Sequence, residues 1–132
     1  MKPARFDYYS PSSRDEALEL LGQYGDDAKI LAGGQSLMPM MNMRLVRPKV
    51  VIDINRIAGL SHISPRRDAG LAIGAMTRQR ELERSALVLE TAPLLSWAIP
   101  YIGHFQIRNR GTVGGSLAHS DPAAEIPAVC LT

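Results

Sequence analysis

The chain has 132 residues, of which 45% are hydrophobic, so it is long enough to form one domain with a hydrophobic core. Its 15 basic and 13 acidic side chains nearly balance, which gives no electrostatic reason to expect nucleic acid as a partner. The single cysteine excludes an internal disulfide and a cysteine-ligated cluster and is typical of a reducing compartment. Because no signal peptide or membrane-spanning run is recognisable, a cytoplasmic location is expected.

The first predicted element is a helix. Ser13 and Glu16 form a capping-box pattern, apolar residues then recur at helical spacing, and Gly25 ends the run. The sequence therefore predicts an amphipathic helix between Ser13 and Gly25.

Two short apolar segments, 28–32 and 50–54, predict buried strands. Between them, Ser36 is expected to cap a helix over residues 37–45, because Ser is a preferred N-cap residue. Residues 1–57 therefore predict a β-α-β-α-β unit that forms a first subdomain.

A second subdomain is expected over residues 58–132. It opens with a predicted hairpin, 60–63 against 71–75, and Thr77 is expected to cap a short helix that ends at Arg84. Pro93 is expected to open another helix.

The segment 101–110 has no clear period, and it leads to a glycine pair. Asp121 and Pro122 are typical of the N-cap and first position of a further helix, which Pro127 is expected to kink.

Two glycine segments, 32–36 (AGGQS) and 112–116 (TVGGS), are the main candidate site. Adjacent glycines have no Cβ, so each segment is expected to adopt positive φ, at Gly114 for example, and to turn several amides toward a phosphate. Neither segment matches a Walker A loop or the G-x-G-x-x-G fingerprint. The alternative is that both segments are tight turns.

Other polar residues carry weaker signals. Asp121 is either an N-cap or a ligand contact, with capping the safer interpretation. Arg108 and Arg110, with Arg44 and Arg47, are either a docking surface or solubilising charge, and solubilising charge is favoured for each singly. The histidine spacing supports no metal site, and Cys130 has no activating context for nucleophilic catalysis.

Four ordered segments carry a family resemblance: 32–39 (AGGQSLMP), 73–77 (IGAMT), 106–116 (QIRNRGTVGGS) and 118–125 (AHSDPAAE). In that order they resemble the FAD-binding subunit of molybdenum hydroxylases. The likeness is greatest to the medium subunit of aerobic carbon monoxide dehydrogenase, which is related to the FAD domain of xanthine dehydrogenase.

The resemblance implies an α+β fold, the FAD-binding fold of the vanillyl-alcohol oxidase and molybdopterin dehydrogenase type. FAD would lie between the subdomains 1–57 and 58–132. Family members continue past Thr132, so the second subdomain would be incomplete and the fold C-terminally truncated. The implied FAD contacts are Ala32, Gly33, Gly34, Gln35, Ser36, Leu37, Thr112, Val113, Gly114, Gly115, Ser116 and Asp121.

The resemblance also implies a role. FAD would pass electrons from iron-sulfur clusters in a small subunit, which receives them from a molybdopterin large subunit, to an external acceptor. The chain would then act in a hetero-oligomer, with no catalytic acid or base and no metal site of its own. Ser116 stands where many relatives have asparagine, and the single cysteine excludes the extra iron-sulfur cluster that some relatives carry.

Two alternatives remain open. The chain is an assembly module that docks on an iron-sulfur partner through the Arg108–Arg110 cluster without stable flavin, or it binds nucleotides generically through its glycine segments.

Overall fold

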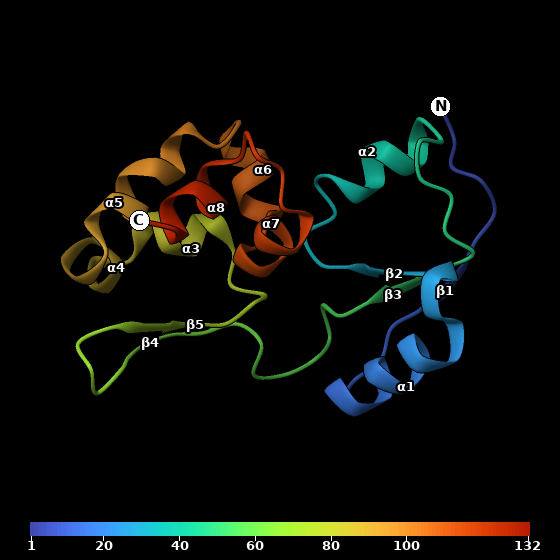
Figure 1. Cartoon of the computed structure of the whole chain (residues 1–132), viewed down its shortest axis with the longest axis horizontal. Helices are drawn as coiled ribbons and strands as arrows, with labels where there is room; N and C mark the ends of the chain where they lie inside the picture. The colour runs from blue at the N-terminus through green and yellow to red at the C-terminus, as the bar shows by residue number, and fades with distance from the viewer. The chain divides into compact units, whose positions relative to one another are not determined.

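The computed structural model describes residues 1–132, and the chain divides into two units, Met1–Ala58 and Gly59–Thr132 (Figure 1). Each unit contains its own cluster of buried apolar side chains. The mixture of helices and strands is the α+β class that the sequence predicts.

The first unit contains a three-stranded parallel sheet. Strands β1 (Asp7–Tyr9), β2 (Ala28–Leu31) and β3 (Val50–Asp53) lie in the order β1-β3-β2. The central strand β3 is the most buried, because its residues 50–52 are at most 2% exposed. Helix α1 (Arg14–Tyr24) packs its Ala17 into the same core. The element order confirms the predicted β-α-β-α-β unit.

The capping of α1 is confirmed in detail. Ser13 Oγ accepts a hydrogen bond from the Glu16 amide at 3.2 Å. The carboxylate of Glu16 accepts from the Ser12 amide at 2.9 Å. In a capping box this carboxylate bonds to the amide of the N-cap residue, so here the bond is made one residue before the N-cap. Gly25 ends the helix at a φ of 49°, a conformation that residues with a Cβ rarely adopt, and the 3-10 turn η1 (Gly25–Asp27) follows.

Helix α2 (Leu37–Asn42) is shorter than the predicted 37–45. Ser36 is its N-cap residue, but the Ser36 side chain makes no capping hydrogen bond because its backbone is already in the helical region. The chain leaves the helix through a turn in which Arg44 adopts a φ of 57°.

The second unit begins with an antiparallel hairpin, β4 (Ile63–Pro65) against β5 (Leu71–Ile73). Pairing continues beyond the strands, because the amides of Gly74 and Met76 donate to the carbonyls of His62 and Leu60. The predicted hairpin is therefore confirmed, with its regular ladder shifted toward the turn.

Helices make up the rest of this unit, and they enclose a core that includes Leu82, Ile99 and Ile126, each 0% exposed. Their bounds are α3 (Gln79–Arg84), α4 (Ala86–Thr91), α5 (Pro93–Ala98), η2 (Ile99–Tyr101), α6 (Phe105–Arg110), α7 (Val113–His119) and α8 (Glu125–Cys130).

Three helix expectations for this unit need correction. Thr77 does not cap α3, because its hydroxyl bonds to the backbone of His62 instead. The segment without a clear period contains α6. Helix α8 begins at Glu125, so Pro127 lies in its first turn, where a missing N–H breaks no internal bond and causes no kink.

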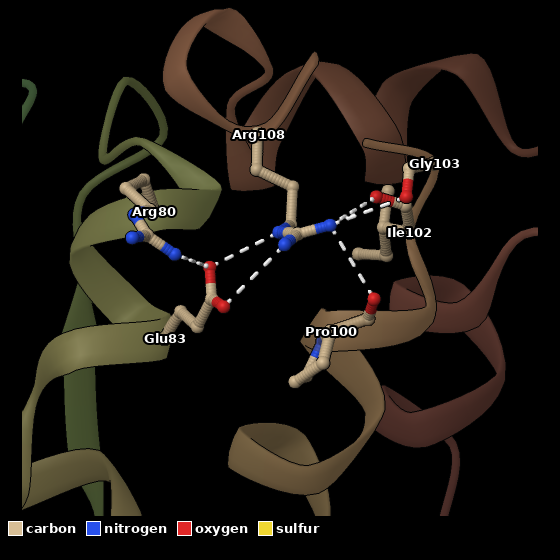
Figure 2. A network of polar contacts seen from close by, with 6 residues as sticks. All are labelled: Arg80, Glu83, Pro100, Ile102, Gly103 and Arg108. Carbon is tan, nitrogen blue, oxygen red and sulfur yellow. Dashed lines mark hydrogen bonds and ion pairs between the residues drawn. The ribbon is translucent and has the colours of Figure 1, made fainter. Parts of the chain in front are cut away.

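Arg108 of α6 is a structural residue and not surface charge. It is 8% exposed, and its guanidinium lies between Glu83 of α3 and the carbonyls that follow α5 (Figure 2). Nε donates to Glu83 Oε2 at 3.0 Å, and the same oxygen lies 2.7 Å from Arg80 Nη1. Nη1 also donates to the carbonyls of Pro100, Ile102 and Gly103.

We expect Arg108→Met to destabilise the protein by about 3 kcal/mol, because it leaves three carbonyls and part of a half-buried carboxylate without a donor. Arg110→Met is the control, since Arg110 is an exposed arginine on the same helix. Urea unfolding measures the free energy of unfolding of both variants and of the wild type. Equal stability of the two variants would contradict the structural role of Arg108.

The same network predicts a pH dependence. The hydrogen bond from Arg80 and the bond and charge of Arg108 hold the pKa of Glu83 below its usual value. A depressed pKa in the folded state means stability that is present above the unfolded pKa and is lost as the pH falls through the folded pKa. Glu83→Gln should therefore be less stable than the wild type near neutrality, and this difference should shrink below about pH 4. Melting curves from pH 3 to 7 test this, and a constant difference would refute it.

Candidate functional site

The first glycine segment forms the link between β2 and α2 (Figure 1). Gly33 is buried, and Gly34 has a φ of 74°. A Cβ on Gly34 would also lie 3.1 Å from Leu31 Cδ1 and 3.2 Å from Met38 Cγ. Both the backbone conformation and the space around it therefore favour glycine at this position.

The amides of this link are unused. None of the backbone N–H groups of Gly33, Gly34, Gln35 and Ser36 donates a hydrogen bond within the protein. The link is nevertheless held in place: the Gly34 carbonyl accepts from the Met38 amide at 3.1 Å, and Gln35 Nε2 donates to the Gly33 carbonyl at 3.0 Å. Consecutive unpaired amides in an ordered turn form a concavity that binds anions.

A polar chain supports this link from the neighbouring strands. Asn55 Nδ2 donates to the Ala32 carbonyl at 2.8 Å, and the Asn55 amide donates to Asp53 Oδ1 at 2.9 Å. Tyr8 donates its hydroxyl to Asp53 Oδ2, and this bond raises the pKa of Tyr8. Ala32 follows β2, and Asp53 and Asn55 lie at the end of β3, so these three residues mark the carboxyl ends of parallel strands, where open α/β sheets bind their ligands.

Sequence reasoning missed the contribution of Tyr8, Asp53 and Asn55. A signal was present for two of them, because Asp53 ends the buried strand β3 and Asn55 follows it. The contact between Tyr8 and Asp53 was not predictable, because β1, which carries Tyr8, has three residues and too little periodicity to be recognised.

The second glycine segment is the start of a helix and not a loop. Thr112 is the N-cap of α7, and its Oγ1 accepts from the Gly115 amide at 3.1 Å. The Ser116 amide donates to the Thr112 carbonyl at 3.1 Å. The Val113 amide donates to the Thr77 carbonyl, also at 3.1 Å. These three amides therefore all donate to oxygens of Thr112 or Thr77.

Gly114 is required for close packing. Its amide donates to the Ala75 carbonyl at 2.8 Å, and a Cβ built on it would lie 2.6 Å from Ala75 Cβ and 2.7 Å from Ala75 O. The expectation that Gly114 adopts positive φ is wrong, because positive φ at glycine occurs only at positions 25, 34, 59 and 103.

Two polar side chains, one in α7 and one just after it, keep hydrogen-bonding capacity for a ligand. Ser116 Oγ, which is half-buried, makes no hydrogen bond within the protein. Asp121 is exposed, and its Oδ1 accepts from the Ala123 amide at 2.9 Å in a turn. Asp121 is therefore not the N-cap of α8, which is Ala124.

No three histidine, cysteine or carboxylate side chains lie close enough together to hold a metal ion. None of the helices has the length and apolar character needed to cross a membrane.

Comparison with known proteins identifies the family. Residues 4–132 match the model of the FAD binding domain in molybdopterin dehydrogenase. The chain belongs to this family, which confirms the resemblance drawn from the sequence segments and the expectation of FAD as cofactor.

Two curated relatives illustrate the similarity. The chain is 53% identical over 131 residues to the 6-hydroxypseudooxynicotine dehydrogenase complex subunit alpha of Paenarthrobacter nicotinovorans, covering 99% of the chain and 44% of the relative. It is 48% identical over 133 residues to the carbon monoxide dehydrogenase medium chain of Hydrogenophaga pseudoflava, covering 99% of the chain and 45% of the relative. The chain thus spans less than half the length of these relatives.

Two solved structures have a fold similar to that of this chain. A structure of carbon monoxide dehydrogenase from Hydrogenophaga pseudoflava that lacks the Mo-pyranopterin moiety matches with a TM-score of 0.94 at 49% identity, covering 98% of this chain and 45% of that chain. Quinoline 2-oxidoreductase from Pseudomonas putida 86 matches with a TM-score of 0.91 at 38% identity, covering 96% of this chain and 44% of that chain.

The packing of Gly114 predicts a stability effect that does not depend on a ligand. We expect Gly114→Ala to destabilise the protein by about 1–3 kcal/mol, because the new methyl group overlaps the Ala75 backbone. Gly22→Ala is the control, since nothing lies within 4 Å of its Cβ position in α1, and it should stabilise by roughly 0.5–1 kcal/mol. Chemical unfolding without FAD measures both. Wild-type stability of Gly114→Ala would show that the close approach is absent.

Proposed function

We propose that this chain holds the pyrophosphate of FAD on the amides of residues 33–36 and forms part of the flavoprotein subunit of a molybdenum hydroxylase complex. The observation that carries the proposal is the run of four unpaired amides in an ordered link at the carboxyl end of β2. Gly34 at positive φ gives the turn the backbone conformation in which these amides stay unpaired. The residues present therefore fit the cofactor of the family.

The two glycine segments would contribute differently. In the first, backbone amides of Gly33, Gly34, Gln35 and Ser36 would donate to phosphate oxygens, while Ala32 and Leu37 frame the turn. In the second, the amides of residues 113–116 are engaged, so its contact would come from the Ser116 hydroxyl, with the backbone of Thr112, Val113, Gly114 and Gly115 fixing its place. Asp121 would accept a hydrogen bond from a ligand hydroxyl through its exposed carboxylate.

When bound, FAD supplies the electron-transfer chemistry of such an enzyme. The residues of this chain would bind and orient the dinucleotide and would act neither as catalytic acid nor as base. We propose that electrons reach the cofactor from an iron-sulfur small subunit, which is supplied by a molybdopterin large subunit, and leave to an external acceptor in the cytoplasm. The relatives named as a medium chain and as a subunit of a dehydrogenase complex support this arrangement.

The alternative of an assembly module that docks through Arg108 and Arg110 loses much of its basis. Arg108 is buried and engaged with Glu83 and three carbonyls, so it is not available to a partner.

FAD titration of the full-length protein tests the proposal. We expect Gly34→Ala to raise the Kd for FAD by about tenfold or more, because the added Cβ disfavours positive φ and turns the amides away from the phosphate. Gly25→Ala is the matched control: Gly25 also has positive φ, lies in the same unit and has open space around its Cβ position. Its strain should cost about 1–2 kcal/mol of stability without a change in Kd.

Flavin fluorescence measures the affinity and thermal unfolding measures the stability of each variant. No saturable FAD binding by the wild type, or equal loss of affinity in both variants, would contradict the proposal.

A further inference from the structure

A basic hollow lies in the first unit, away from the glycine segment. It has a volume of about 620 Å³ and is lined by residues 2–6 together with Arg44 and Arg47. Four of these seven residues are cationic, namely Lys2, Arg5, Arg44 and Arg47, and none is acidic.

The topology places this hollow at the opposite edge of the sheet from the unpaired amides. Residues 2–6 lead directly into β1, and the Arg44–Arg47 turn leads toward β3, so both precede the strands (Figure 1). The Asp7 amide donates to the Lys49 carbonyl at 2.8 Å and closes this edge. Because the three strands are parallel, the amides of residues 33–36 follow the other edge. The hollow is therefore not part of the FAD grip.

The two arginines are held in place by the backbone. Arg44 Nε donates to the Lys2 carbonyl at 3.2 Å, and Arg47 Nε donates to the Arg44 carbonyl at 3.0 Å. Arg44 has a φ of 57°, and its amide donates to the Met41 carbonyl at 2.9 Å. Non-glycine residues in this conformation carry strain, which persists only where the surroundings fix it and is found most often at functional sites.

The charges of the hollow are uncompensated. None of its four cations forms an ion pair with a carboxylate of the chain, whereas Lys49 at the adjoining strand end is paired with Asp27 at 2.8 Å. The charge of the hollow therefore favours an anionic partner.

Exposed apolar groups on the same turn favour a protein as that partner. Met43 is 50% exposed and Leu45 is 71% exposed, and they flank Arg44. Arginine and methionine are enriched at protein interfaces, whereas small-molecule sites are mostly enclosed and apolar.

We propose that this hollow docks an acidic surface of another subunit of the complex. The proposal rests on the proposed function, because it requires that the chain acts in an assembly. Carboxylates of the partner would pair with Lys2, Arg5, Arg44 and Arg47, while Met43 and Leu45 would pack against its apolar groups.

The test compares two double variants of the full-length protein. Arg5→Glu with Arg47→Glu reverses charge in the hollow, and Arg67→Glu with Arg84→Glu makes the same change at exposed arginines of the second unit. Binding to the purified iron-sulfur and molybdenum subunits is measured by interferometry at several salt concentrations. We expect the hollow variant to raise Kd by about tenfold or more and to flatten its salt dependence, and the control to stay near the wild type.

Bound flavin is measured in the same samples and separates the two proposals. Normal FAD content with weakened assembly supports the docking surface, whereas loss of FAD in the wild type contradicts the proposed function and not the docking. Zero-length carbodiimide coupling gives a second readout, in which Lys2 should link to partner aspartates or glutamates and Lys29 should not. Equal Kd values for the two variants, or saturable binding of inorganic pyrophosphate in the hollow with assembly unchanged, would overturn the proposal.

Discussion

The first glycine segment must remain ordered while four consecutive amides have no partner inside the protein, and the rest of the candidate site depends on this constraint. Unpaired amides are costly when they are kept from water, so such a link needs outside support. The structure supplies it through Asn55, which holds the Ala32 carbonyl, and through Asp53 and Tyr8, which fix Asn55 in turn. A parallel sheet places these groups at one edge because its strands share one direction.

Glycine has a different purpose in each segment. At Gly34 the backbone requires positive φ, whereas at Gly114 the chain is helical and the missing Cβ allows contact with Ala75. The same residue pair in the sequence therefore produces an open turn in one unit and a tightly packed helix start in the other. Substitutions at Gly34 should act first on the ligand, and substitutions at Gly114 should act first on the stability of the second unit.

The elements predicted well were those whose signals are local. The cap at Ser13, the end of α1 at Gly25 and the buried strand before Asn55 all follow from short patterns of residue types. The predictions that failed depended on distant partners. Thr77 bonds to His62 instead of capping α3, and Arg108 is buried against Glu83, which lies 25 residues earlier in the chain. The family was recognisable because its segments are ordered along the chain, but which amides are free was not, since hydrogen-bond partners are set by tertiary contacts.

The proposed function requires that the amides of residues 33–36 receive the pyrophosphate of FAD. Amide hydrogen exchange of the full-length protein, with and without FAD, tests it most directly. We expect fast exchange at residues 33–36 in the flavin-free protein and strong protection when FAD is added, while residues 113–116 are protected in both states by their internal bonds. Exchange at residues 33–36 that is unchanged by saturating FAD would show that these amides do not bind the pyrophosphate.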